Sequence, residues 1–204
     1  MKVLLHTPDQ IDSLDEDEYL AKLSSSKDGL ALPFCQQRIQ ALNNLGKKLM
    51  SSPYSATAPQ ILALGFWLRK SALKRIQQEL LPELPDRYAV PRGLAFHLPP
   101  GNVDTLFAYS WALSFLAGNQ NVVRLPSQMN PVAEFLVETI LSTLKEAELS
   151  DFQHFVLFDK TSTLVRDISA QSDLRVIWGG DAKILEISRD PIRPDGLSLG
   201  FSDR

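Results

Sequence analysis

From Pro91 onward, short strand-type segments alternate with helix-type segments, and this alternation constrains the fold more than any other feature of the sequence. The strand-type segments are rich in β-branched and aromatic residues, whereas the segments between them carry apolar residues at helical spacing. The strand candidates are residues 93–98, 121–125, 152–158, 174–178 and 197–201. Strand–helix alternation with short connections gives right-handed crossovers, so the sequence predicts a Rossmann-like α/β fold with a parallel sheet flanked by helices.

Two helices of this part have strong individual signals. Residues 104–117 are apolar on nearly every side, which is typical of a buried helix. Asn130 followed by Pro131 is an N-cap with proline at the first helical position, so a helix should begin there.

The first 90 residues have a different pattern, which favours helices throughout. One helix is expected within 34–50, after Pro33, and another, uninterrupted, within 61–81. We therefore divide the chain into a helical N-terminal segment, 1–90, and a Rossmann-like core, 91–204.

Composition excludes several classes of protein. The chain has 21 basic and 24 acidic residues, a net charge of −3, so it lacks the basic excess that binds nucleic acid. No apolar run reaches the ~18 residues of a membrane span. A single cysteine, Cys35, cannot build an internal disulfide framework and fits a reducing compartment. The sequence therefore predicts a globular cytoplasmic protein.

Three predicted strand ends carry residues suited to a ligand, which in a parallel sheet binds beyond the carboxyl ends of the strands. The first turn offers the amide of Asn102 near a helix start, where it would stabilise an oxyanion. The second pairs the cation of Arg124 with Ser127 and the neutral Gln128, a combination that suits a 2′-phosphate. The third turn is Gly179-Gly180-Asp181, whose amides before a helix suit a pyrophosphate.

Each of these features also has a purely structural interpretation. Asn102 is also consistent with a helix cap, Arg124 with a solvated surface arginine, and the two glycines with a tight turn. The usual GxGxxG fingerprint is absent, so an ordinary Rossmann dehydrogenase is not supported.

The remaining reactive side chains favour structural roles. Cys35 lies in an amphipathic helical segment, where a structural thiol is expected. His97 and His154 lie inside strand candidates with no second metal ligand at a recognisable spacing, so we expect core histidines and no metal site.

Residues 91–128 resemble the cofactor-domain signature of the aldehyde dehydrogenase superfamily. The variant is most similar to the acyl-CoA reductase branch, which includes the bioluminescence-type fatty acid reductases. The resemblance covers roughly residues 85–204 and rests on ordered motifs, namely His97, Pro100-Gly101-Asn102-Val103, Gly118-Asn119, Asn121-Val122-Val123 and Val176-Ile177-Trp178-Gly179-Gly180-Asp181.

The resemblance implies roles for the same residues. Asn102 takes the oxyanion-donor position beside the acyl carbonyl, and Arg124 the position of a lysine that contacts the adenosine ribose or its phosphate. Ser127 and Gln128 take neighbouring ribose positions, and Gly179, Gly180 and Asp181 the turn beside the pyrophosphate. Arg124 and Gln128 depart from the superfamily's common Lys and Glu, which favours NADPH over NADH.

The resemblance also implies a reaction and a missing part. Members attack an acyl thioester with a cysteine in a second domain, and the nicotinamide delivers hydride to give an aldehyde. No cysteine follows Cys35, so we expect a cofactor-binding half of an acyl-CoA reductase that is inactive by itself and works with a catalytic domain. Two alternatives remain open: a non-catalytic nucleotide-binding or assembly module, and an unrelated enzyme that uses Cys35. The sequence does not determine the length of the acyl group or the oligomeric state of the protein.

Overall fold

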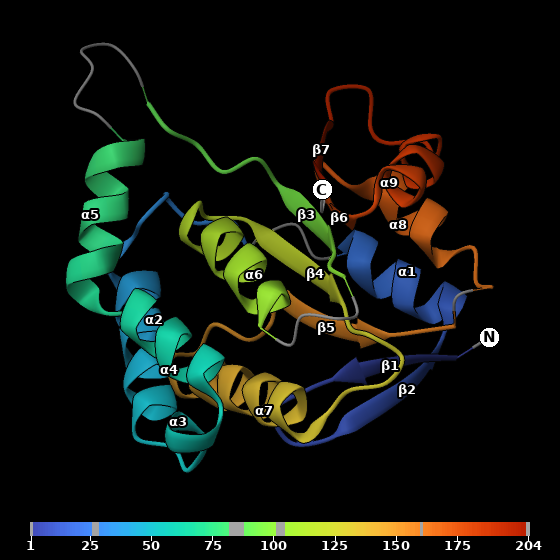
Figure 1. Ribbon diagram of the computed structural model, residues 1–204. Helices are drawn as coiled ribbons and strands as arrows, with labels where there is room; N and C mark the ends of the chain where they lie inside the picture. Colours follow the sequence, from blue (N-terminus) through green and yellow to red (C-terminus); the bar gives the residue numbers. More distant parts are fainter. Residues whose placement is uncertain (1, 26–28, 82–87, 101–104, 160, 203–204) are drawn as a thin grey trace.

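The structure, a computed structural model, describes residues 2–25, 29–81, 88–100, 105–159 and 161–202. Within these ranges a seven-stranded sheet has the order β2-β1-β5-β4-β3-β6-β7 (Figure 1). The strands are β1 (Lys2–His6), β2 (Ile11–Asp15), β3 (Leu94–Leu98), β4 (Gln120–Arg124), β5 (Gln153–Leu157), β6 (Leu174–Gly179) and β7 (Leu197–Ser202). The helices are α1 (Glu16–Ser25), α2 (Gln36–Met50), α3 (Tyr54–Thr57), α4 (Pro59–Trp67), α5 (Lys70–Leu80), α6 (Leu106–Leu116), α7 (Pro131–Glu146), α8 (Leu164–Gln171) and α9 (Asp181–Ser188).

The five strands from β3 onward pair with one another in parallel, as the alternating pattern predicts. All five residues of β3 are buried, because this strand has a partner on each side and a helical layer on each face. The predicted start of α7 is also confirmed: the side chain of Asn130 accepts a hydrogen bond from the amide of Ala133 at 2.9 Å, and Pro131 follows it.

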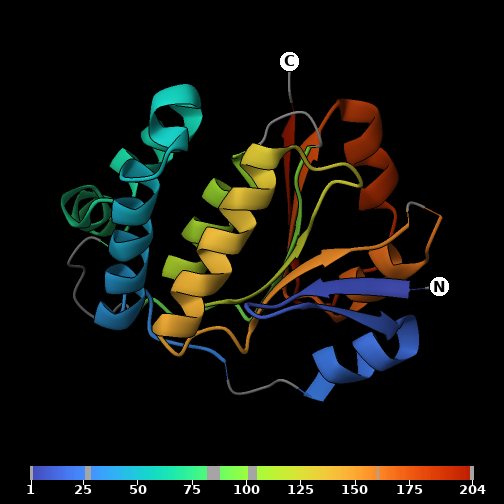
Figure 2. The ribbon, with the colours of Figure 1, turned by 90° about the horizontal axis from the view of Figure 1, so that it is seen from below.

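Helices cover both faces of the sheet and form two hydrophobic cores. Helices α6 and α7 lie on one face, with α2 to α5 outside them, whereas α1, α8 and α9 lie on the other face (Figure 2). Phe155 of β5 belongs to the first core and Val156 to the second, as the alternation of a strand requires. No helix in the described part of the chain is long and apolar enough to cross a membrane.

A buried arginine joins the outer helices to the inner layer. Arg38 of α2 is 3% exposed, and its guanidinium donates to the carbonyl oxygens of Phe115 (2.7 Å), Asn119 (2.9 Å) and Gly29 (2.9 Å). The same group lies 4.6 Å from the ring centroid of Phe115, and burial lowers its pKa. Arg38 therefore supplies donors to the carbonyl end of α6, where a helix has none of its own.

The prediction of helices throughout residues 1–90 is wrong for residues 2–15. These residues form the antiparallel hairpin β1–β2, and β1 also pairs antiparallel with β5, so the sheet is mixed. Val3 and Leu5 are buried while their neighbours are more exposed, which is the period of two expected for a strand. The turn closes with a hydrogen bond from the amide of Thr7 to the carbonyl of Gln10 at 2.9 Å.

The single helix expected at 61–81 is two helices. Arg69 has extended backbone angles (φ −64°, ψ 143°), which end α4 and begin α5. The side chain of Asn43 in α2 accepts from the amide of Lys70 at 2.9 Å and so satisfies a donor at the start of α5. A tertiary contact, rather than local sequence, determines this break.

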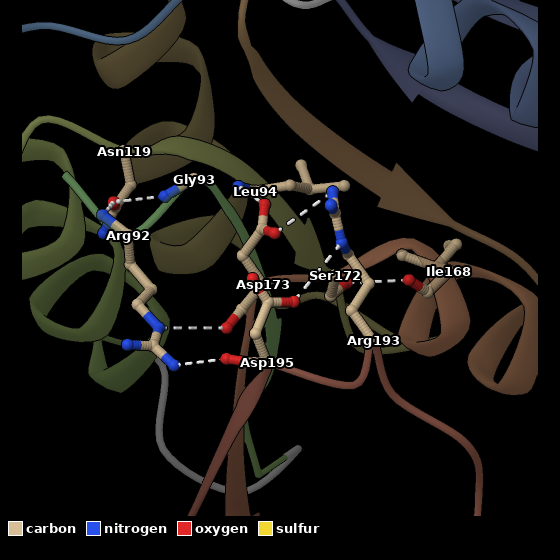
Figure 3. Close-up of polar contacts among 9 residues, drawn as sticks. All are labelled: Arg92, Gly93, Leu94, Asn119, Ile168, Ser172, Asp173, Arg193 and Asp195. Atoms are coloured by element: carbon tan, nitrogen blue, oxygen red, sulfur yellow. Dashed lines mark hydrogen bonds and ion pairs between the residues drawn. The ribbon is translucent and has the colours of Figure 1, made fainter.

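A polar cluster closes the amino-terminal edge of the sheet (Figure 3). The carboxylate of Asp173 accepts from the amide of Leu94 at 2.7 Å and pairs with Arg193 at 3.2 Å. Arg92 donates to the carbonyl oxygens of Asp173 and Asp195. Gly93 has φ +129°, and a Cβ there would clash with the Asp173 carboxylate. The start of β3 is therefore built around a glycine.

We predict that Gly93→Ala lowers the free energy of unfolding by about 2 kcal/mol or more, because it adds backbone strain and a steric clash. Urea denaturation of the variant measures the change. The same substitution in an Asp173→Ala background should cost less, because the clash is then absent. Equal costs in the two backgrounds would contradict this explanation.

The two strand histidines are buried, as expected from the sequence. His97 is 0% and His154 is 6% exposed, and burial lowers the pKa of each to about 4. The ring of His97 contacts Ser110 at 2.8 Å and Asn121 at 2.9 Å, whereas His154 contacts the hydroxyl of Tyr19 at 3.3 Å. Both rings are therefore neutral at pH 7.

These pKa values predict acid-sensitive stability. Between the usual histidine pKa of 6.5 and about 4, the unfolded chain binds protons that the folded chain does not. The free energy of unfolding should therefore fall as the pH decreases through this window, by up to about 1.4 kcal/mol per pH unit for each histidine. Urea denaturation between pH 7 and pH 4.5 should show a weaker pH dependence in His154→Gln than in the wild type, and parallel curves would refute the assignment.

Candidate functional site

The carboxyl ends of β3, β4 and β6 lie at one edge of the sheet, because the three strands are parallel and β3 lies between the other two. From β3 the chain proceeds to β4 and β5 on one side and returns to β6 and β7 on the other. This reversal of strand order is where open α/β sheets form their ligand crevice.

A cavity of about 840 Å³ opens at this edge. It brings together the end of β3, the segment after β4, the start of α8 and one side of α9. Its lining residues are Leu98, Pro99, Arg124, Leu125, Pro126, Ser127, Gln128, Ser162, Thr163, Val165, Arg166, Lys183, Glu186, Ile187 and Asp190. Arg124, Ser127 and Gln128 of the predicted site line the cavity, whereas Gly179, Gly180 and Asp181 do not, and Asn102 lies outside the described residues.

Arg124 is a cation held in a partly apolar setting. Its guanidinium carbon lies 4.9 Å from the ring centroid of Phe158, and its Nε atom is buried with no hydrogen-bond partner among the described residues. Burial lowers the pKa of Arg124, although the nearby Asp159 opposes that shift. Burial of a donor that has no hydrogen-bond partner costs free energy. The guanidinium of Arg124 is therefore suited to bind an anion that enters the cavity.

The turn after β6 leads directly into α9. Gly179 has φ +145°, a conformation that residues with a Cβ rarely adopt, and Gly180 is the N-cap. The carboxylate of Asp181, the first residue of α9, accepts from the hydroxyl of Ser202 at 2.5 Å. The turn therefore exposes backbone donors at a helix start beside the cavity.

Lys183 is a lining residue that the sequence analysis missed. It lies in the first turn of α9 and donates from Nζ to the carbonyl of Trp178 at 3.3 Å. The helix dipole makes a cation unfavourable in the first turn of a helix. A lysine at this position of the predicted helix was therefore a signal in the sequence that could have marked Lys183 as a candidate site residue.

The sequence analysis also missed the wall of the cavity that is formed by α8 and the segment before it. It contributes Ser162, Thr163, Val165 and the exposed Arg166. No local motif marks these residues; only the crossover from β5 to β6 brings them beside α9. Together with Arg124 and Lys183, Arg166 gives the cavity three basic side chains against two acidic ones, Glu186 and Asp190. The arrangement suits an anionic ligand that also carries an apolar, flat group.

Two further features are a cysteine that does not line this cavity and a second cavity that adjoins it. Cys35 is half-buried just before α2 and is not a lining residue. A second cavity, of about 800 Å³, lies between the β1–β2 turn and α7 and shares Pro126 and Ser127 with the first. In the part of the chain described, no cluster of three or more His, Cys, Asp or Glu residues is arranged to hold a metal ion.

Comparison with known proteins identifies a family and a fold. A family model described as acyl-CoA reductase (LuxC) matches residues 74–204. No curated protein gives a significant sequence match.

Several solved structures share the fold. An NAD-dependent benzaldehyde dehydrogenase from Corynebacterium glutamicum is 14% identical with a TM-score of 0.67, over 98% of this chain and 51% of that protein. Proline utilization A from Bradyrhizobium japonicum is 16% identical with a TM-score of 0.72, over 93% and 22%. Glyceraldehyde-3-phosphate dehydrogenase GapN from Methanocaldococcus jannaschii, complexed with NADP, is 14% identical with a TM-score of 0.61, over 98% and 49%.

These structural matches confirm the predicted α/β fold, a sheet flanked by helices. The chain spans about half the length of the benzaldehyde dehydrogenase and about a fifth of proline utilization A.

Proposed function

Because the chain belongs to the acyl-CoA reductase (LuxC) family, we propose that it is the NADPH-binding part of an enzyme that reduces an acyl thioester to an aldehyde. The observation that carries this proposal is the basic cavity at the carboxyl edge of the sheet, with the buried Nε of Arg124 on its wall. An apolar surface with a few convergent charged groups is the usual form of a cofactor site.

The cavity residues fit the adenosine half of NADPH. Leu98, Val165 and Ile187 offer an apolar surface to the adenine, and Ser127 and Gln128 lie where the ribose hydroxyls would bind. Arg124 would bind the 2′-phosphate, which supplies the anion that its buried Nε lacks. The neutral Gln128 adds no repulsion there, so NADPH is favoured over NADH.

The remaining predicted residues extend the site toward the reacting group. Gly179, Gly180 and Asp181 form the turn proposed to lie beside the pyrophosphate, and Lys183 would add a positive charge. Asn102, which lies outside the described residues, remains our candidate for the donor that stabilises the acyl oxyanion. When bound, NADPH supplies the hydride that reduces the acyl group.

We also propose a division of labour between this chain and a catalytic domain. Residues 91–204 form the cofactor-binding core in this proposal, and 1–90 the N-terminal segment, whose hairpin β1–β2 extends the same sheet. The acyl-CoA substrate and the attacking thiolate belong to the catalytic domain, because the single cysteine of this chain does not line the cavity.

Arg124→Gln should weaken NADP⁺ binding about tenfold or more, since a hydrogen bond to a charged group is worth about 1.5–3 kcal/mol. NAD⁺ binding should change much less, because NAD⁺ has no 2′-phosphate. Isothermal titration with both nucleotides measures the difference. Arg75→Gln on the exposed side of α5 is the matched control and should leave both affinities unchanged. Equal losses for NADP⁺ and NAD⁺ in Arg124→Gln would refute the 2′-phosphate assignment.

The chain by itself should show no acyl-CoA-dependent oxidation of NADPH, because its single cysteine, Cys35, is not among the residues that line the cavity. The decrease in absorbance of NADPH in the presence of a fatty acyl-CoA measures this activity. Turnover by the purified chain would contradict the proposed division of labour.

The alternative, a non-catalytic nucleotide-binding or assembly module, has a separate outcome. A chain that binds neither NADP⁺ nor NAD⁺ would favour an assembly role, whereas binding that depends on the 2′-phosphate supports the reductase proposal.

A further inference from the structure

Trp178 is the last side chain of β6 before the Gly179–Gly180 turn, and it is held from the α6 face of the sheet. Its indole Nε1 donates to the hydroxyl of Ser110 in α6 at 3.4 Å. Its ring stacks on Phe201 of β7, with centroids 4.3 Å apart and planes 17° apart. Trp178 and Phe201 are register partners of adjacent parallel strands, so both side chains lie on the same face.

The hydrogen bonds around His97 determine the direction of the Ser110 proton. The amide nitrogen of Asn121 donates to the side chain of Gln153 at 2.8 Å and to the carbonyl of Asn119 at 3.2 Å, so its Oδ1 is an acceptor. His97 Nε2, 2.9 Å from that Oδ1, must therefore carry the ring proton.

The Nδ1 of a neutral His97 then has only a lone pair. Ser110 Oγ, 2.8 Å from Nδ1, must donate its single proton there. Toward Trp178 the serine can only accept, which matches the indole, a group that can only donate. The chain Trp178 to Ser110 to His97 thus has one consistent direction, and each polar atom in it is satisfied.

The main chain of Trp178 is fixed from the opposite face. Its carbonyl oxygen accepts from Nζ of Lys183 in α9 at 3.3 Å. A Cβ at Gly179 would lie 3.1 Å from the Cδ of Lys183, so the lysine stem packs against the turn. Contacts from α6, β7 and α9 therefore converge on the residue from which the turn begins.

We propose that Ser110 is a positioning residue of the cofactor site: by accepting the indole proton of Trp178 it fixes the orientation of the Gly179–Gly180 turn, and through that turn the affinity for NADP⁺. This inference rests on the proposed function, because it concerns the same nucleotide. Ser110 itself is buried and acts through Trp178.

Ser110→Ala should raise the dissociation constant of NADP⁺ about three- to tenfold, the fold-change that corresponds to one lost hydrogen bond. Ser114→Ala is the matched control, since Ser114 is a buried serine one turn further along α6 whose hydroxyl accepts from Asn119 at 3.1 Å. The control should lose stability without a change in NADP⁺ affinity. Ser110→Thr, which keeps the hydroxyl, should restore most of the affinity.

Trp178→Phe tests the same hydrogen bond from the other side, because it removes the indole donor and keeps an aromatic ring stacked on Phe201. Alone it should weaken NADP⁺ binding to a similar extent, and Ser110→Ala added to it should have little further effect. In nucleotide-free protein, the ¹H–¹⁵N indole signal of Trp178, assigned from its loss in Trp178→Phe, should shift in Ser110→Ala and stay in place in Ser114→Ala.

The outcomes separate this inference from the proposed function. A wild-type chain that does not bind NADP⁺ refutes the proposed function and the inference with it. A wild-type chain that binds NADP⁺, with an unchanged dissociation constant in Ser110→Ala, refutes the inference alone. Additive losses in the double variant, or an indole signal that does not move in Ser110→Ala, would also overturn it.

Discussion

The pairing of β3 with β4 on one side and β6 on the other is the constraint on which the rest of the structure depends. Because β3 is enclosed on both edges and both faces, its side chains must be apolar or have internal partners, and His97 meets this requirement only as a neutral ring. The same pairing places the ends of three strands side by side. The cavity is therefore a consequence of strand order, and its chemistry comes from the segments that follow the strands.

Within that cavity, burial and charge act in opposite directions on Arg124. The ring of Phe158 and the protein around the guanidinium remove water, which disfavours the charged form, whereas Asp159 favours it. A cation in this state gains more from a bound anion than a fully solvated arginine would, because its donor has little water to lose. Such a group is preorganised for a negative ligand, which is what the proposed binding of a 2′-phosphate requires.

The sequence predicted the features that depend on short-range patterns. The buried helix α6, the Asn130–Pro131 start of α7 and the central parallel strands all have strong local signals, and the structure confirms them. Arg124, Ser127 and Gln128 were predicted as site residues because they lie at or just after the end of a strand, and the structure places all three in the lining of one cavity.

The features it missed depend on contacts between distant segments. The hairpin β1–β2 has a period of two over only five residues per strand, and its stability comes from pairing with β5, about 150 residues away in sequence. The break between α4 and α5 is fixed by Asn43 of α2. Arg166 and the rest of the α8 wall reach the cavity only through the crossover from β5 to β6, and no motif within α8 announces that role.

Arg38 has a consequence that extends beyond its own surroundings. Its three carbonyl partners belong to the segment before α2, the end of α6 and the residue just before β4, so one rigid guanidinium links the outer helices to the sheet layer. Releasing α2 would break all three of these hydrogen bonds to a charged donor, which is costly. Partial opening of the outer helices is thereby penalised, and the layers are coupled into one cooperative folding unit.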